Sequence, residues 1–423
     1  MKKTLSLMLM LALLTIIAIP AVGAAAPKVS ITWMHHFAEE GMVGWVQKLA
    51  DEFMAMYPEC EVLVEAVPGS SYDQTLKTRI ANEDAPMIFD MMNGRTGLAE
   101  FYNAGHLALL DEMECLDRIV EDVLIEGQLD GHQAGIPWDQ LSYAAFYNVD
   151  LFNELGLTVP TTLDEFYAVL NTLKDNGYIA LTSPYGESWC IACAMYPILY
   201  SEVDTDANPN WWTQLMNREI RFSDDEDFKA AMKEFITLLD YAEDDPFGTS
   251  SATAYYNLAN SKAGIFINGS WVLDGASSLN PDINLGCFAV PTDNSGEPRM
   301  MMASGTISCL YNSPDPLKME YGRKLYNYIY STASGEYYAS IAKRITGVKD
   351  VDLTAYPNLN EILTYPRTFS LAGKNQFSAE FSTYYIECVS AALQDYMDSR
   401  DVDAAVESLV ASLDEGFDDI AGI

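Results

Sequence analysis

The chain has 423 residues, with 24 Lys and Arg against 61 Asp and Glu, which gives a formal net charge of −37. Such an excess of carboxylates repels nucleic acids and anionic lipid headgroups, so we set aside DNA, RNA and membrane-surface binding. Hydrophobic residues make up 49% of the chain and aromatic residues 12%, which favours a folded protein with a large core. The length exceeds what one core usually supports, and we expect two lobes or domains.

The N-terminus has the pattern of a secretory signal peptide. Lys2 and Lys3 precede a mainly apolar run over residues 5–19, and Pro20 is followed by small residues up to Ala26. A membrane anchor is the alternative, but a bilayer span needs a longer run and has no cleavage site. We therefore expect residues 1–26 to be cleaved, which removes two lysines and takes the net charge from −37 to −39. No cysteine follows the expected cleavage site, so no lipid anchor is expected.

The cysteines are seven in number, so at least one stays unpaired within a monomer. Cys190 and Cys193 have the spacing of a redox motif or of half a zinc site. No second cysteine pair or nearby histidine completes four ligands. We interpret the pair as a local disulfide or as two buried thiols, and we expect no metal and no cofactor.

The first part of the mature chain alternates between strand and helix patterns. Residues 29–33, 61–67 and 87–91 are predicted strands, and residues 43–57, 72–80 and 96–103 are predicted helices. This alternation predicts a parallel sheet with helical crossovers, so the first lobe is expected to be α/β. In such sheets ligands bind beyond the carboxyl ends of the strands. The loops 34–41, 68–71 and 92–95 should therefore line a pocket.

Later segments continue the mixed pattern. Thr162 and Glu165 have the spacing of a capping box, which predicts a helix that ends near Gly177. Further predicted strands are 263–268 and 283–290, and further predicted helices are 318–330, 336–344, 377–397 and 402–413.

Signatures of catalysis are absent from the sequence. It contains no Gly-x-Ser-x-Gly elbow, no phosphate-binding glycine loop and no His-Glu-x-x-His helix. The adjacent His35 and His36 could bind a metal, but no carboxylate lies at ligand spacing, and a polar role in a loop is the better interpretation. A glycosidase needs only two carboxylates, and 61 acidic residues leave that alternative open.

Several sequence blocks, taken in order, resemble a known family. They are Asp51-Glu-Phe53, Tyr57-Pro58, 61–65, 71–77, Ala85-Pro86, 102–111, Gly135-Ile-Pro-Trp-Asp-Gln140, Phe146-Tyr-Asn148, 150–166, Ala263-Gly-Ile-Phe-Ile-Asn-Gly-Ser-Trp271, Leu285-Gly286 and Val290-Pro291. Their order and spacing are similar to those of bacterial extracellular solute-binding protein family 1, the sugar-binding proteins of ABC transporters. The resemblance covers nearly the whole mature chain.

The resemblance implies a two-lobe, type II periplasmic-binding-protein-like α/β fold with a ligand cleft between hinge-linked lobes. Lobe one would comprise residues 27–137 and 286–344, and lobe two residues 138–285 and 345–423. The lobes would close on a carbohydrate and dock on ABC transporter permease subunits, without catalysis. The protein is then expected to be a monomer at the periplasmic or extracellular face of a bacterial membrane.

Sugars present an apolar C–H face and a rim of hydroxyls, so aromatic platforms combined with polar groups are expected to bind them. Trp271 matches the aromatic platform of the family, against the alternative of a core tryptophan. The other candidates are Trp138, Asp139 and Gln140 past the first hinge; Tyr185, Glu187 and Trp189 in lobe two; His36, Glu39, Tyr72, Asn93 and Arg95 in the lobe-one loops; and Ser304, Gly305 and Tyr384 later in the chain.

Two alternatives remain for Tyr384 and for the ligand. Tyr384 also fits the buried stripe of a helix. The ligand could instead be another polar solute, such as a polyol or a phosphorylated glycerol compound. A phosphate would call for converging basic residues, and Arg95 is the only one that the sequence places in the cleft.

Overall fold

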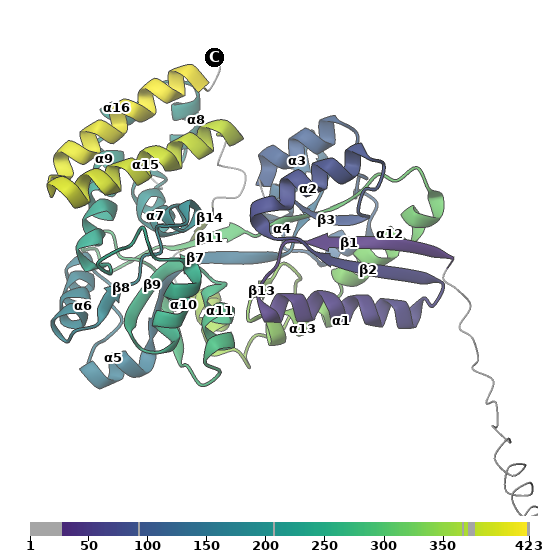
Figure 1. Ribbon diagram of the computed structural model, residues 1–423, viewed down its shortest axis with the longest axis horizontal. Coiled ribbons are helices and arrows are strands. Elements are labelled where there is room, and N and C mark those ends of the chain that lie inside the picture. Colours follow the sequence, from purple (N-terminus) through teal and green to yellow (C-terminus); the bar gives the residue numbers. More distant parts are fainter. Residues whose placement is uncertain (1–27, 92–93, 206–207, 366–367, 371–376, 421–423) are drawn as a thin grey trace, which may run out of the picture.

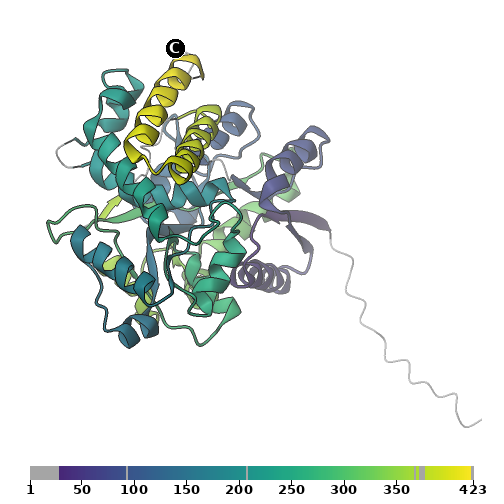
Figure 2. The same cartoon turned by 60° about the vertical axis from the view of Figure 1, so that its left-hand side comes forward.

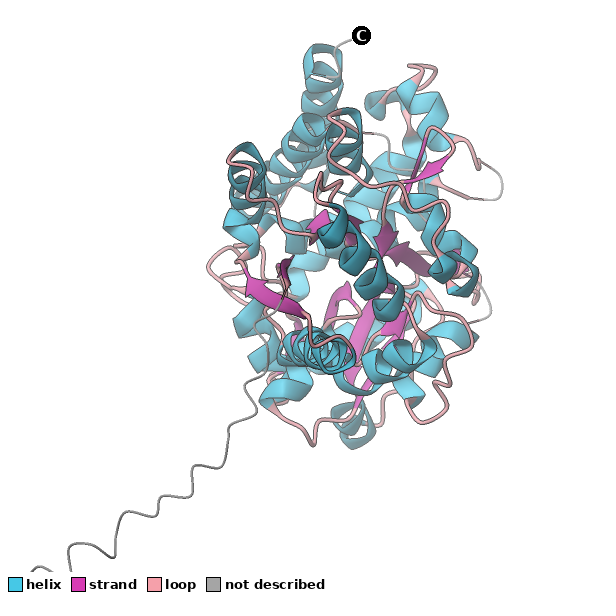
Figure 3. Ribbon diagram, turned by 90° about the vertical axis from the view of Figure 1, so that its right-hand side faces the viewer, coloured by secondary structure: helices cyan, strands magenta, loops and turns pink. Residues whose placement is uncertain are grey.

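Two lobes lie side by side in the computed structural model, and the long strand β7 (Asp139–Asn148) runs from one toward the other (Figure 1). The structure describes residues 28–91, 94–205, 208–365, 368–370 and 377–420. In both lobes helices surround a sheet, as the turned views in Figure 2 and Figure 3 show. The fold is therefore α/β with two lobes, as the sequence predicts.

The first lobe is built on a five-stranded sheet in the order β2-β1-β3-β12-β6. Its elements are β1 (Val29–His35), α1 (Glu40–Met56), β2 (Cys60–Ala66), α2 (Gly69–Ala81), β3 (Ile88–Met91), α3 (Gly94–Asn103), η1 (Glu114–Arg118), α4 (Glu121–Glu126), β4 (Gln128–Leu129), β5 (His132–Gln133), β6 (Ile136–Pro137), β12 (Ile307–Leu310), α12 (Pro316–Ile329) and α13 (Thr332–Ala342). Strand β1 pairs in parallel with β2 and β3, which confirms the predicted parallel sheet. Strand β12 joins it antiparallel to β3 and β6.

The second lobe contains a sheet in the order β14-β11-β7-β9-β8, and β10 and β13 also pair with β7. Its elements are β7, α5 (Val149–Leu155), α6 (Leu163–Asp175), β8 (Ile179–Leu181), α7 (Ser188–Val203), α8 (Trp211–Met216), η2 (Phe222–Asp224), α9 (Glu226–Thr237), η3 (Leu238–Tyr241), α10 (Ser251–Ala259), β9 (Ala263–Gly269), α11 (Val272–Leu279), β10 (Leu285–Phe288), β11 (Met300–Ser304), β13 (Ile345–Thr346), α14 (Pro357–Thr364), β14 (Thr368–Ser370), α15 (Ala379–Ser399) and α16 (Val402–Ile420). Helices α15 and α16 pack against each other and against α9.

Helix α1 shows how apolar spacing positions an element. Its buried side chains include Trp45, Leu49 and Phe53, which recur at four-residue intervals and so share one face. Trp45 packs edge-on against Trp33 of β1, with 5.7 Å between ring centroids. This aromatic contact holds the start of α1 against the sheet, beside the carboxyl end of β1.

The chain crosses between the lobes at three places. It enters the second lobe after β6, at Trp138, and returns between β11 and β12, through Gly305 and Thr306. The expected return at residue 286 is too early, because β10 and β11 both pair with β7 of the second sheet. The third crossing follows α13, where Ile345 pairs with Gln140 of β7.

The seven cysteines are all free thiols, and Cys190 and Cys193 lie buried on α7. Burial raises the pKa of both thiols, so neither is poised as a nucleophile. The structure therefore supports the second interpretation of this pair, as two buried thiols. In the described part of the chain no helix is long and apolar enough to cross a membrane. The expected signal peptide lies outside the described residues.

Candidate functional site

An aromatic cluster lies where β9 ends and α11 begins. Trp271 is half-buried and immediately precedes α11. Its ring lies 5.8 Å from that of Tyr143 at 90° and 6.1 Å from that of Trp189 at 55°. A Cβ at Gly269 would lie 2.2 Å from the Trp271 ring, so the indole covers this glycine closely. Trp271 and Trp189 therefore form a partly exposed tryptophan surface that packs on Tyr143 and Gly269. Trp271 is not a side chain inside a core.

Glu187 anchors the outer part of this cluster. Trp189, whose side chain is 40% exposed, donates its Nε1 hydrogen to one Glu187 oxygen at 2.8 Å. The other oxygen accepts the backbone N–H of Ser251 at 2.7 Å. Tyr185 instead lies inside the lobe-two core beside Phe235, and is therefore a packing residue in this structure.

A buried charge cluster lies at the crossing between the lobes. Arg344 donates to Glu39 at 2.8 Å and lies 3.6 Å from Asp139, which also accepts the Tyr338 hydroxyl at 2.6 Å. Burial raises the pKa of Asp139, although Arg344 opposes this shift. Burial also opposes ionisation of Glu39, but the charge of Arg344 and backbone N–H groups together lower its pKa. The one arginine thus holds two carboxylates at the hinge.

Asp274 adds a carboxylate from the second lobe to this cluster. It lies on α11, three residues after Trp271, and is buried. A Cβ at Gly41, in the first turn of α1, would lie 3.0 Å from its Oδ1, so the two lobes meet here. Burial raises the pKa of Asp274 to about 6, and the attraction of Arg344 only partly offsets this.

Strand β7 connects the aromatic and charged clusters. Asp139 and Tyr143 are four residues apart on this strand and so face the same side. Gly305 allows the second crossing to approach Asp139 closely, because a Cβ there would lie 1.7 Å from Asp139 Oδ1. The candidate residues Ser304, the last residue of β11, and Gly305 therefore adjoin the charge cluster. Gln140 is half-buried, and its amide donates to the Thr346 carbonyl at 3.4 Å.

Lobe one contributes His36 beyond the end of β1. Its Nδ1 lies 2.5 Å from Oδ2 of the buried Asp90, and its side chain is 20% exposed. Tyr72 is fully buried; its hydroxyl donates to the Met34 carbonyl at 3.0 Å and accepts the Asp90 N–H at 2.8 Å. Tyr72 therefore supports this loop from inside.

Three further candidates lie elsewhere. Trp138 is buried in the lobe-one core, stacked on Trp33 and Tyr330. Arg95 donates to the Ile125 carbonyl at 3.0 Å. Tyr384 belongs to the α15–α16 interface, where its hydroxyl donates to a carbonyl of α16. Asn93 lies outside the described residues.

The sequence interpretation did not single out Tyr143, Asp274, Tyr338 or Arg344 as site residues. Tyr143 had a usable signal, since it lies in the strand that follows the predicted first hinge. Arg344 had a weaker one, because it marks the expected third crossing. Asp274 and Tyr338 had no local signal, because their neighbours come from the other lobe or from residues far away in the chain.

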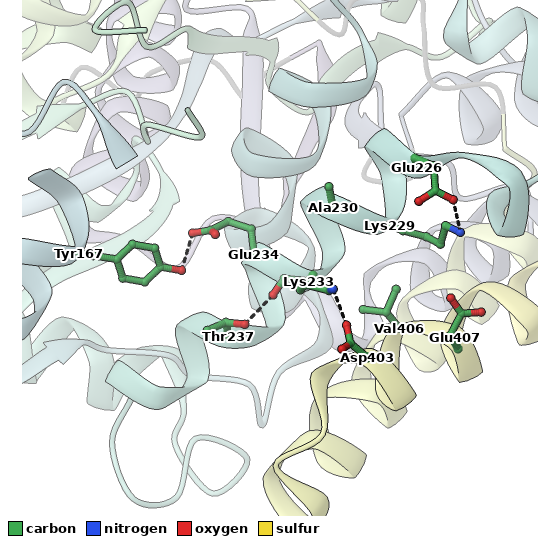
Figure 4. A pocket seen from close by; sticks show the side chains of 10 residues that line it. All are labelled: Tyr167, Glu226, Lys229, Ala230, Lys233, Glu234, Thr237, Asp403, Val406 and Glu407. Carbon is green, nitrogen blue, oxygen red and sulfur yellow. Dashed lines mark hydrogen bonds and ion pairs between the residues drawn. The ribbon is translucent and has the colours of Figure 1, made fainter. Parts of the chain in front are cut away.

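A surface pocket on the outer side of lobe two is separate from these clusters. It lies between α9 and α16; an ion pair joins Lys233 of α9 to Asp403 of α16, and a second pairs Lys229 with Glu226 within α9 (Figure 4). None of the predicted site residues lines it. Within the described ranges, no group of three or more His, Cys, Asp or Glu side chains could hold a metal ion.

The family is shown by a sequence comparison. A family model for bacterial extracellular solute-binding proteins matches residues 39–336, which is most of the chain. The protein belongs to this family, as the order of its sequence blocks predicts.

Individual relatives are distant in sequence and close in fold. A multiple sugar-binding protein of Streptococcus mutans is 25% identical over 64% of each chain, so just under two thirds of its length is matched. The melibiose/raffinose/stachyose-binding protein of Bacillus subtilis is 23% identical over 70% of each chain. A solved chitin oligosaccharide binding protein superimposes with a TM-score of 0.78 at 19% identity, covering 92% of this chain and 100% of the other.

Proposed function

We propose that the protein is an extracytoplasmic receptor that captures a mono- or oligosaccharide between its lobes, closes on it by hinge motion and delivers it to an ABC import permease. The observation that carries this proposal is the tryptophan surface of Trp271 and Trp189, which adjoins Tyr143 of β7 and the hydrogen-bonded carboxylate of Glu187. An indole face matches the C–H face of a sugar, and fixed polar groups match its hydroxyls. The sugar-binding names of relatives support the same ligand class.

The charges around the site favour an uncharged sugar. Glu39, Asp139 and Asp274 gather there around Arg344, whose guanidinium already contacts two of them. A carboxylate or phosphate on the ligand would meet this acidic group without a converging set of basic side chains. The net charge of −37 acts in the same direction, because neutral solutes feel no repulsion from it.

The test is calorimetric titration with neutral sugars that include raffinose, stachyose, melibiose, maltotriose and chitin oligosaccharides. We expect saturable binding of at least one sugar, and Trp271→Ala should weaken it at least about tenfold while the unliganded melting temperature changes little. The stacking contact is lost, whereas the half-buried indole contributes little to the core.

Tyr256→Ala is the matched control. Tyr256 is 47% exposed and lies beside Lys262, before the start of β9. Trp271 follows the other end of that strand, so the control removes an exposed aromatic ring away from the proposed platform. The Tyr256→Ala variant should bind the sugar with the same affinity as the natural protein. Equal affinity in the Trp271→Ala variant would contradict the proposed platform. Release of hydrolysis products in the same mixtures would favour a glycosidase over a receptor.

A further inference from the structure

Asp90 is a buried hub between the lobe-one loop and the hinge. It lies within β3 and has no exposed surface. Its Oδ1 accepts the Trp138 Nε1 hydrogen at 2.8 Å, and its Oδ2 accepts the backbone N–H of His36 at 2.9 Å. The same Oδ2 lies 2.5 Å from the ring Nδ1 of His36. Three nitrogen atoms thus converge on one carboxyl group.

These contacts decide which ring nitrogen of His36 carries the hydrogen. The indole N–H and the backbone N–H can only donate, so both Asp90 oxygens are already acceptors. The Asp90 carboxylate, which accepts both of these N–H groups, also accepts a hydrogen bond from an N–H at His36 Nδ1. In the neutral ring, Nε2 is then left without a hydrogen, and it acts as a hydrogen-bond acceptor.

The orientation of the His36 ring is fixed by its neighbours. Phe37 lies 4.6 Å away between ring centroids, and Tyr72 meets the ring edge-on at 6.1 Å. Tyr72 is itself held by its hydrogen bonds to Met34 and Asp90. Nδ1 faces the buried carboxylate, and 20% of the His36 side chain is exposed to solvent.

Asp90 also reaches the first crossing between the lobes. Trp138 immediately precedes β7, and its backbone N–H donates to the Thr306 carbonyl at 3.1 Å in the second crossing. Its ring stacks on Tyr330 with 5.9 Å between centroids. One carboxylate therefore joins the His36 loop to two strands that cross the hinge.

We propose that Asp90 is a positioning residue that holds the His36 imidazole with Nε2 as an acceptor for a solute hydroxyl, and that it links this contact to the hinge through Trp138. The inference rests on the proposed receptor function, which it deepens by assigning a hydroxyl-donating ligand group to lobe one. Phosphate or carboxylate oxygens, which lack such a hydrogen, would not satisfy this acceptor.

The first experiment replaces His36 by Asn. The Asn amide can still donate to Asp90 from near the position of Nδ1, but it has no atom at the position of Nε2. We expect the sugar that binds best to bind about tenfold more weakly, with an unchanged melting temperature. His132→Asn is the matched control, because His132 forms a similar pair with Asp111, at 2.9 Å, on the exposed β4–β5 hairpin.

The second experiment needs no stable variant. In protein labelled with ¹⁵N-histidine, the two ring nitrogens of His36 should show the Nδ1–H form in the absence of sugar. Saturation with sugar should shift the Nε2 resonance. Where Asp90→Asn folds, its amide cannot accept from all three donors, and the His36 ring should lose the Nδ1–H form together with affinity.

The outcomes separate the two proposals. An Nε2–H form in the natural protein, an Nε2 resonance that sugar does not move, or full affinity in a folded His36→Asn variant would overturn the role of Asp90 and His36 while the receptor function stands. Failure of every sugar to bind the natural protein would contradict the receptor function itself, and with it this assignment.

Discussion

Arg344 supplies the positive charge that pairs with the buried carboxylates at the crossing between the lobes. Its guanidinium is 7% exposed and contacts Glu39 and Asp139, which come from opposite sides of the first crossing. A buried charge is tolerated only when it is paired, so each member of this cluster depends on the others. Asp274 is the exception, because its Oδ2 is buried and has no hydrogen-bond partner among the described residues.

This exception predicts a pH-dependent stability. The folded pKa of Asp274 is raised to about 6, so the folded state binds its proton more tightly than the unfolded chain does. Ionisation of Asp274 therefore destabilises the fold above pH 6, by up to about 3 kcal/mol for a shift of about two units, and this cost is relieved as the pH falls from about 6 to about 4.

Asp274→Asn mimics the protonated side chain, so we expect the variant to be more stable than the natural protein at pH 7.5, and this difference to shrink to about a third at pH 4.5. Urea unfolding at the two pH values measures the difference. Glu39, Glu40 at the start of α1, and Arg344 face Asp274 and are present in both proteins, so their own titration largely cancels. A difference that does not change with pH would show that Asp274 titrates normally.

At the scale of elements, helix starts are set by local side chains. The Thr162 side chain accepts the Glu165 N–H at 3.3 Å, and Glu165 accepts the N–H groups of Thr161 and Thr162. The predicted capping box is therefore confirmed, and α6 begins at the next residue, Leu163. These bonds satisfy backbone donors that a helix start otherwise leaves unpaired.

Thr162→Ala should lower the free energy of unfolding by about 1 kcal/mol, because the Glu165 N–H loses its acceptor. Thr172→Ala on the same helix is the control. The Thr172 side chain is half-buried and donates only to the Ala168 carbonyl one turn earlier, so its loss should be neutral or slightly stabilising. Chemical denaturation of both variants measures the contrast, and equal effects would argue against the capping box as the cause.

At the scale of the whole molecule, three crossings hold two lobes that each have their own core. The hinge closure that we propose would change the distance between the lobes without breaking either core. We expect the sugar identified by calorimetry to reduce the radius of gyration in small-angle X-ray scattering. At a sugar concentration near the dissociation constant of the natural protein, the Trp271→Ala variant should stay largely in the unliganded form. A radius that sugar leaves unchanged in the natural protein would contradict closure.

Local patterns predicted the elements well and the site only in part. Strands β1, β2 and β3 and helix α1 follow from spacing along the chain, because strand and helix periods depend on near neighbours. Trp271 also had a local signal in the block that ends β9. Tyr72 and Tyr185 fell in the expected segments, but the structure buries both side chains, and burial depends on what packs from elsewhere.

The sequence by itself determined the α/β class, the family and most element boundaries, since these depend on composition, periodicity and the order of blocks. Only the tertiary structure decided that Arg344 joins Glu39 to Asp139, that Asp274 meets α1, and that β10 and β11 belong to the second sheet. The physical reason is that hydrogen bonds and burial act through space. Glu39 and Arg344 lie hundreds of positions apart, and no pattern along the chain predicts their contact.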